Sequence, residues 1–227
     1  MFTQDQLKQQ VAQAALDYVL PLLQPGDILG VGTGSTVDRF IDLLAAHRSA
    51  FRAAASSSER STQRLREAGI PVLDLNAVHA LALYVDGADE IDGQLNMIKG
   101  GGGALTREKI VASVADRFVC IVDESKLVER LGRFPLPIEV IPLAREAVAR
   151  TLRQFGGQPV VRPDFLTDNG CQILDVSGLD LSEPAEFEAM INNIPGVVCN
   201  GLFAISGADV AIVAGQSGLR SLHAVLS

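Results

Sequence analysis

The first half of the chain alternates between helical and extended hydrophobic patterns. Apolar residues recur at helical spacing from Thr3 to Leu23 and again from Ser35 onward. Between and after these segments, short apolar runs at residues 27–32, 51–55 and 81–85 are typical of buried strands. A further run lies at residues 117–122. Strands that alternate with helices predict a parallel sheet covered on both faces.

The pattern changes after Arg130. The segment Phe134–Val140 contains two prolines, which predicts a domain boundary followed by an edge strand. A helical pattern follows at residues 142–155, and then an alternating stretch at 165–176 surrounds Asn169-Gly170, which is a hairpin signal. This part of the chain therefore predicts an α+β arrangement with an antiparallel sheet.

The last apolar run, at residues 208–214, has the pattern of a fully buried strand. We expect it to rejoin the first sheet. The predicted organisation is an α/β domain with a Rossmann-like parallel sheet, formed by residues 1–130 plus 207–227, and a small α+β domain formed by residues 131–206.

Composition narrows the function classes. The 227 residues include 19 Lys+Arg and 27 Asp+Glu, a formal net charge of −8. An acidic protein of this kind is a poor nucleic-acid binder, since phosphate backbones need a basic surface. A single small phosphorylated ligand is still compatible with it, because one local pocket is enough to hold such a ligand.

Cysteines, apolar runs and histidines favour a cytoplasmic protein without a metal centre. Cys120, Cys171 and Cys199 are isolated, which fits a reducing compartment. The N-terminus has no leader-like apolar core, and no apolar run reaches the roughly 18 residues of a membrane span. No zinc-ligand spacing is formed by the three histidines, His47, His79 and His223.

The first candidate site is the glycine-rich turn at residues 30–36, GVGTGST, between a predicted strand and helix. Backbone N–H groups at a helix N-terminus attract anions, and glycines allow a phosphate to approach closely. The turn lacks the lysine of a Walker loop, and Ser35 replaces the third glycine of a dinucleotide fingerprint. The alternative is a tight turn in which Ser35 only caps the helix.

The second candidate is the acidic segment VDGADEID at residues 85–92, directly after a buried strand. Ligands bind outside the carboxyl ends of parallel strands, where Asp86 is expected, and paired carboxylates there could exchange protons with a substrate hydroxyl. The spacing does not match a calcium loop, because Ala88 and Glu90 stand at ligand positions. The alternative is a solvated acidic turn.

The third candidate is KGGGGALTRE at residues 99–108, in which four glycines precede a predicted helix. Thr106 is a plausible N-cap, which would place Glu108 in the first turn, where the helix dipole favours an ionised base. Alternatively, Glu108 only stabilises the helix. A fourth segment, DESK at 123–126, brings Lys126 to the same expected sheet edge.

Taken together, these motifs resemble ribose-5-phosphate isomerase of the A type. The resemblance rests on TQDQLK (3–8), GTGST (32–36), VDGADEID (85–92), KGGGGALTREK (99–109), DESK (123–126) and PLPIEVIP (135–142), and it covers essentially the whole chain. Gly103 departs from the family pattern, which usually has alanine there.

The resemblance implies an α/β main domain with an inserted small α+β, ferredoxin-like domain, and a homodimer or homotetramer. It implies interconversion of ribose 5-phosphate and ribulose 5-phosphate without a cofactor, with Glu108 as the catalytic base and Asp86, Asp89 and Lys99 assisting. The residues that match substrate-binding positions of the family are Thr33, Gly34, Ser35, Thr36, Asp86, Gly87, Ala88, Asp89, Lys99, Gly100, Gly101, Gly102, Lys126 and Lys8.

These residue types suit an enediolate route. A carboxylate base moves a proton between C2 and C1, while Lys99 and glycine-loop N–H groups stabilise the oxygen charge. A hydride shift would need a metal on two oxygens, and the sequence offers no evident metal cage. Two alternatives remain: a sugar-phosphate-sensing regulator domain and an enzyme similar to coenzyme A transferases.

Overall fold

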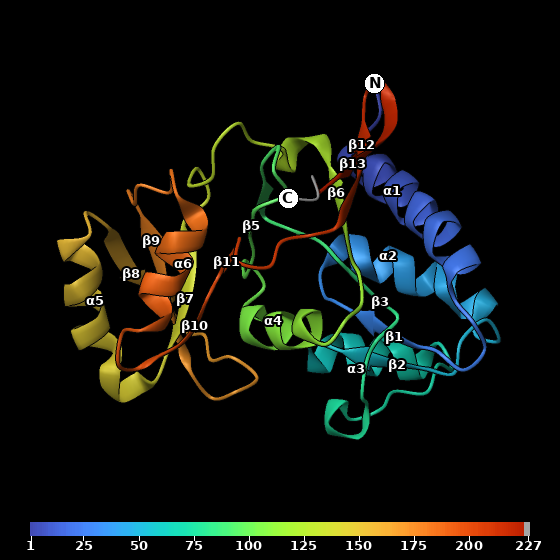
Figure 1. Ribbon diagram of the computed structural model, residues 1–227, viewed down its shortest axis with the longest axis horizontal. Coiled ribbons are helices and arrows are strands. Elements are labelled where there is room, and N and C mark those ends of the chain that lie inside the picture. Colours follow the sequence, from blue (N-terminus) through green and yellow to red (C-terminus); the bar gives the residue numbers. More distant parts are fainter. Residues whose placement is uncertain (225–227) are drawn as a thin grey trace. The chain divides into compact units, whose positions relative to one another are not determined.

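The computed structural model describes residues 1–224, which form two compact units (Figure 1). The first unit contains Met1–Gly87, Arg107–Lys126 and the chain from Ala208 onward. The second contains Ala88–Thr106 and Leu127–Gly207. Each unit has its own sheet system and hydrophobic core.

The first unit contains a six-stranded sheet in the order β13-β12-β6-β3-β1-β2. Its strands are β1 (Ile28–Val31), β2 (Ala53–Ser56), β3 (Leu83–Asp86), β6 (Phe118–Asp123), β12 (Val210–Gly215) and β13 (Gly218–His223). All neighbours pair in parallel except β13, which forms an antiparallel hairpin with β12. Because β12 pairs in parallel with β6, the prediction that the last apolar run rejoins the first sheet is confirmed.

The helices in this part of the chain are α1 (Gln4–Val19), α2 (Ser35–Leu44), α3 (Glu59–Glu67) and α4 (Leu105–Ser113). The short 3₁₀ turns of this part are η1 (Leu20–Leu22), η2 (Ala45–His47), η3 (Leu75–Ala77) and η4 (Glu124–Lys126). Helix α1 begins at a capping box: Thr3 Oγ1 accepts from the Gln6 N–H, and the Gln6 side chain accepts from the Thr3 N–H. It packs on α2, β6 and β12, with Val11 and Ala15 fully buried.

Strand order reverses at β1 in the first unit. β1 lies between β2 and β3, so the chain leaves β1 toward one side of the sheet and β3 lies on the other. Such a reversal of strand order is the switch point at which ligands bind in open parallel sheets, at the carboxyl ends of the strands. Gly32 and Asp86 therefore stand side by side at that edge, as the register Val31↔Val85 requires.

The second unit contains a four-stranded antiparallel sheet, β10-β7-β9-β8, and a three-stranded sheet, β11-β5-β4. The elements are β4 (Glu90–Ile91), β5 (Met97–Ile98), β7 (Leu136–Val140), η5 (Pro142–Ala144), α5 (Arg145–Gln154), β8 (Gln158–Val161), β9 (Gln172–Ser177), α6 (Pro184–Asn192), β10 (Val197–Asn200) and β11 (Leu202–Phe203). The predicted α+β character of this part is confirmed.

Alternation along β7 separates the two faces of the four-stranded sheet. Leu136, Ile138 and Val140 belong to the core formed with α5 and α6. Because side chains alternate along a strand, Glu139 points to the other face. On that face Ile173 of β9 packs with Leu105, the first residue of α4.

Two local predictions were wrong. β7 is an interior strand between β10 and β9 rather than an edge strand. The Pro137 carbonyl accepts from the Gly201 N–H, just beyond the end of β10. The N–H that proline lacks would point to the same side, where β10 has ended, so Pro137 is tolerated in this strand. The Asn169-Gly170 turn does form, with the Gly170 N–H donating to the Thr167 carbonyl over 2.9 Å, but the strand before it ends at Val161.

The division of the chain also differs from the predicted boundaries. Residues 88–106 and 127–130 were placed in the α/β domain and Gly207 with them, whereas all cluster with the second unit. The glycine-rich segment that enters α4 is thus part of the α+β unit. In the described part of the chain, no helix combines the length and the apolar character needed to cross a bilayer.

Candidate active site

A buried carboxylate, Asp86, lies at the switch point of the first unit. Its Oδ2 accepts from the Tyr84 hydroxyl over 2.5 Å, and its Oδ1 accepts from the N–H groups of Thr33 and Gly87 over 3.1 and 2.7 Å. Gly32 leaves the room for this arrangement, because a Cβ there would lie 1.9 Å from Asp86 Cγ. The glycine turn and the acidic motif are therefore parts of one constellation.

Tyr84, which donates to Asp86, is a buried residue whose pKa is shifted at this site. The side chain is fully buried in β3, two residues before Asp86 on the same face of the strand. Burial, together with the negative charges of Asp86 and Glu108, raises the pKa of the Tyr84 phenol well above its usual range. The phenol is thus a hydrogen-bond donor to Asp86 throughout the physiological pH range.

The turn after β1 leads into a helix whose N-terminus has no side-chain cap. Helix α2 begins at Ser35, and its N-cap is Gly34, at φ +116°, with no side-chain cap. The interpretation of Ser35 as the cap was therefore wrong, and its exposed hydroxyl is not used to cap the helix. The first N–H groups of a helix have no intrahelical acceptor, so this uncapped terminus offers them to a ligand.

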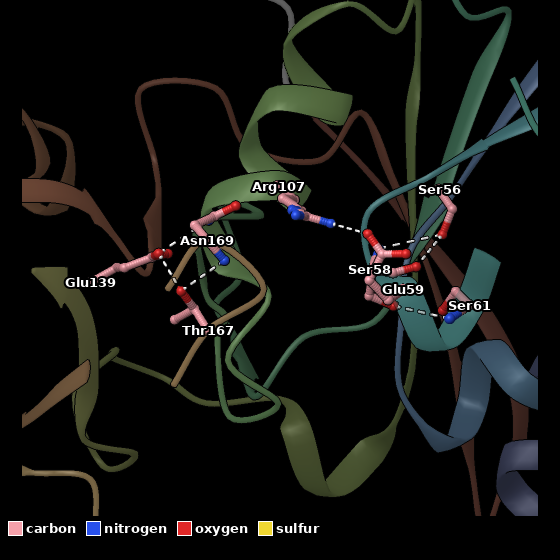
Figure 2. Close-up of polar contacts among 8 residues, drawn as sticks. All are labelled: Ser56, Ser58, Glu59, Ser61, Arg107, Glu139, Thr167 and Asn169. Atoms are coloured by element: carbon pink, nitrogen blue, oxygen red, sulfur yellow. Dashed lines mark hydrogen bonds and ion pairs between the residues drawn. The ribbon is translucent and has the colours of Figure 1, made fainter. Parts of the chain in front are cut away.

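Glu108 lies in the first turn of α4 and is only 4% exposed. Helix α4 starts at Leu105, so Thr106 is inside the helix and not its N-cap; its hydroxyl instead donates to Glu139. The neighbouring Arg107 pairs with Glu59 at the start of α3 over 2.8 Å (Figure 2). The predicted first-turn position of Glu108 is confirmed, although the helix begins at Leu105 and not after Thr106.

The two lysines of the first unit that were predicted to bind the substrate lie on separate elements. Lys126 ends the 3₁₀ turn η4 that follows β6, on the same carboxyl edge of the sheet. Lys8 lies on α1, next to the buried Leu7. Both are half-buried.

The second unit contains the other group of predicted site residues. The Asp89 N–H donates to the Ile98 carbonyl, and Asp89 Oδ2 accepts from the Gly101 N–H over 2.7 Å. A larger residue would not fit at position 101 in this conformation, because a Cβ on Gly101 would lie 2.6 Å from Asp89 Oδ1. The segment Gly100–Gly103, which we call the glycine loop, thus folds over Asp89, with Ala88 half-buried beside it in sequence.

Lys99 immediately precedes the glycine loop and is 2% exposed. Its N–H donates to the Gly201 carbonyl over 2.9 Å, and its Nζ lies 5.5 Å from the centroid of the Phe203 ring. The ring face stabilises the ammonium, and the close backbone contact fixes the residue that carries it. Lys99 is therefore a buried cation held in a defined position.

Three polar residues that take part in these contacts were missed by sequence reasoning. Tyr84 could have been found, since a tyrosine in a buried strand needs a partner for its hydroxyl. Glu139, fully buried, accepts from Thr106. It also accepts from Thr167 and Asn169 (Figure 2). Arg162 contacts the glycine loop. Arg162 lies in no motif, and Glu139 lies in PLPIEVIP, but the partners of both are distant in sequence.

No group of three or more His, Cys, Asp and Glu side chains within residues 1–224 is arranged to hold a metal ion. The three cysteines are free thiols, with Cys120 and Cys199 buried. Burial and the carboxylate of Glu139 raise the pKa of the Cys171 thiol.

Comparison with known proteins identifies the family. Residues 53–218 match the family of ribose 5-phosphate isomerase A (phosphoriboisomerase A). A relative, ribose-5-phosphate isomerase A of Bordetella petrii, is 64% identical over 98% of this chain and 99% of its own length. The chain belongs to the ribose-5-phosphate isomerase A family.

Solved structures of this family share the whole fold. The crystal structure of ribose 5 phosphate isomerase A from Neisseria gonorrhoeae is 44% identical, covers 100% of both chains and has a TM-score of 0.93. A D-ribose-5-phosphate isomerase in complex with phospho-erythronic acid is 36% identical, covers 98% of this chain and 100% of its own, and has a TM-score of 0.91. The predicted resemblance and fold class are confirmed.

Gly103, the departure from the family pattern noted in the sequence, has a structural partner. Its φ is +79°, and a Cβ there would lie 2.2 Å from Cζ of Phe165. The Phe165 ring occupies the space that an alanine side chain would need. In this chain the last residue of the glycine loop is therefore packed by an aromatic ring.

We expect Tyr84→Phe to make stability less sensitive to alkaline pH. The raised pKa means that the folded protein holds the phenolic proton more tightly than the unfolded chain. Its contribution is fully present below the unfolded pKa of about 10 and is lost as the pH rises toward the folded pKa.

The free energy of unfolding, measured by urea denaturation between neutral and strongly alkaline pH, should fall more steeply for the wild type than for Tyr84→Phe. At neutral pH the variant should lose about 1.5–3 kcal/mol, the range for a hydrogen bond to a charged group. Tyr18→Phe is the control with the same tyrosine count. Parallel pH profiles for wild type and Tyr84→Phe would contradict this account.

Proposed function

We propose that the chain interconverts D-ribose 5-phosphate and D-ribulose 5-phosphate, the reaction of the ribose-5-phosphate isomerase A family, through an enediolate with Glu108 as the general base. The observation that carries this proposal is the buried Glu108 carboxylate in the first turn of α4. A base in this reaction has to be ionised and shielded from bulk water, and a helix N-terminus stabilises a carboxylate.

Glu108 takes up the carbon-bound proton and returns it, so the carboxylate ends the reaction in its starting state. In the aldose-to-ketose direction, Glu108 takes the proton from C2, and the electrons of that bond form the C1–C2 double bond of the enediolate as the C1 carbonyl oxygen gains negative charge. A proton then passes from the O2 hydroxyl to the O1 oxygen, and the protonated Glu108 delivers its proton to C1. The C2–O2 bond becomes the ketone carbonyl, and O1 becomes the new hydroxyl. No oxidant or reductant is consumed.

Lys99 and the N–H groups of Gly100 and Gly102 are proposed to stabilise the enediolate oxygen charge, whereas the Gly101 N–H donates to Asp89. A buried ammonium with a fixed backbone is preorganised, so it needs little reorganisation as the charge develops. One such donor is typically worth about 3–4 kcal/mol of transition-state stabilisation.

Asp86 and Asp89 are proposed to exchange protons with substrate hydroxyls. Opening the furanose ring requires loss of the O1 proton and gain of a proton by the ring oxygen, and a carboxylate within hydrogen-bond reach serves both. Each of these two carboxylates is held by backbone N–H donors, Asp86 by Thr33 and Gly87 and Asp89 by Gly101. Their orientation therefore does not depend on the substrate.

The phosphate is assigned to residues Thr33–Thr36, with Lys126 and Lys8 supplying positive charge. The uncapped start of α2 gives free N–H groups, and the hydroxyls of Ser35 and Thr36 add donors. One relative was solved with phospho-erythronic acid, which supports a phosphorylated sugar derivative as the ligand of this chain too.

Family membership favours the isomerase over both alternatives, the sugar-phosphate-sensing regulator and the enzyme similar to coenzyme A transferases. A homodimer or homotetramer and a cytoplasmic location stay predictions of the resemblance and of the cysteine pattern. Independence of any cofactor stays a prediction as well.

The purified chain should convert ribose 5-phosphate to ribulose 5-phosphate in excess EDTA and without added nicotinamide. An enediolate route needs only the bases and donors of the protein itself. Formation of the ketose is followed by its absorbance in the ultraviolet. Activity that disappears in EDTA and returns with a divalent metal would contradict the enediolate route.

Glu108→Gln should lower kcat by about 10²–10⁴-fold, the usual contribution of a general base, while KM changes little. Glutamine keeps the size of the side chain but cannot accept the C2 proton. Glu186→Gln is the matched control, because Glu186 is also a first-turn acid, on α6, and is exposed. Near-normal turnover in folded Glu108→Gln would remove Glu108 from this role.

Ser35→Ala combined with Thr36→Ala should raise KM for ribose 5-phosphate at least about a hundredfold with a smaller loss in kcat, because each hydroxyl bond to a charged group is worth about 1.5–3 kcal/mol and every 1.4 kcal/mol is tenfold. The backbone N–H groups remain and retain part of the affinity. Ser49→Ala, in an exposed turn, is the control. An unchanged KM would place the phosphate elsewhere.

A further inference from the structure

The glycine loop is the most flexible sequence in the chain, yet it is held in one conformation. Four consecutive glycines have more backbone freedom than any other sequence of this length. Within the loop, the Gly103 N–H donates to the Gly100 carbonyl over 2.9 Å, and Gly100 has φ +110°. Glycine has no side chain with which to fix itself, so further restraint has to come from neighbouring residues.

Arg162, just after β8, supplies that restraint. Its Nη1 donates to the Gly100 and Gly101 carbonyls over 3.1 and 3.2 Å. The other edge of the guanidinium forms a bidentate pair with Asp175 on β9, with Nε and Nη2 donating over 2.9 and 2.6 Å. The side chains of this pair are 15% and 27% exposed, so solvent screens it only partly.

The Phe165 ring completes this arrangement. Its centroid lies 5.3 Å from Arg162 Cζ, and the ring also packs on Gly103. The planar guanidinium is thus fixed by Asp175 on one edge and by an aromatic ring nearby. Arg162 therefore reaches the loop in a single orientation.

The contacts run on to the Asp89 carboxylate through one peptide group. The Gly100–Gly101 peptide accepts from Arg162 through its C=O and donates to Asp89 Oδ2 through its N–H. A cation on the carbonyl polarises the amide and strengthens its N–H as a donor, and hydrogen bonds in a series reinforce one another. The Gly101 carbonyl, also bound by Arg162, belongs to the peptide that carries the Gly102 N–H.

We propose that Arg162, held by Asp175, is a positioning residue for the isomerisation: it fixes the glycine loop, and through it Asp89 and the N–H groups that stabilise the enediolate. This inference rests on the proposed function of the loop. Arg162 acts through the loop backbone and is not itself assigned a contact with the substrate.

Arg162→Met should lower kcat about ten- to hundredfold, the equivalent of one or two charge-assisted hydrogen bonds, with less than about a threefold change in KM. KM is spared because the phosphate is assigned to Thr33–Thr36. Arg162→Lys should recover part of kcat, since it keeps the charge but not the bidentate fork.

Hydrogen–deuterium exchange provides a readout that needs no substrate. In Arg162→Met, amides of a peptide covering residues 97–104 should exchange faster, while peptides from α5 and α6 stay as in the wild type. Arg130→Met is the matched control, because Arg130 pairs with Asp180 in the same unit but both side chains are more than half exposed. It should alter neither kcat nor exchange of the loop.

Wild-type kcat together with wild-type exchange at 97–104 in Arg162→Met would overturn the proposal, and so would faster exchange spread uniformly over the second unit. If Arg162→Met does not fold, Asp175→Asn, which keeps the arginine but loosens it, should give the same split between kcat and KM. If the wild type fails to isomerise ribose 5-phosphate, the proposed function fails, whereas local exchange still tests the restraint of the loop.

Discussion

The close approach of β1 and β3 at their carboxyl ends is the constraint on which the first unit depends. Their register places Gly32 beside Asp86, and the absence of a side chain at Gly32 is what admits the carboxylate. The same geometry turns the Thr33 N–H toward Asp86 and starts α2 one residue after Gly34. A buried carboxylate and an uncapped helix N-terminus thus occur together because two neighbouring parallel strands end there.

Several buried carboxylates in this chain accept hydrogen bonds from neutral donors. Asp86 is held by a phenol and backbone amides, Glu139 by hydroxyls and an amide, and Glu188 by the N–H groups of Ala204 and Ile205. Neutral donors satisfy a carboxylate without cancelling its charge. This is a useful property for a protein in which carboxylates are proposed to move protons.

Much of the fold and of the candidate site could be predicted because the signals are local. Strand–helix alternation, glycines at turns and carboxylates after buried strands predicted the parallel sheet and placed Asp86 and the α2 terminus at one edge. The errors arose where partners are distant in sequence. Pro137 predicted an edge strand, but β7 lies between β10 and β9, which come later in the chain. Thr106 was assigned to the helix cap because Glu139, its actual acceptor, lies far along the chain.

The glycine loop shows why the rest required a structure. Its sequence indicates only flexibility. Apart from the hydrogen bond between Gly103 and Gly100, the restraints on the loop come from other segments: Asp89 before it, Arg162 and Phe165 after β8, and Asp175 on β9. Substituting larger residues would stiffen the loop but would place Cβ atoms against Asp89 and Phe165. Glycine lets the loop backbone bring its N–H groups close to a ligand. Because glycine gives the loop no rigidity of its own, a preorganised loop depends on contacts from other segments.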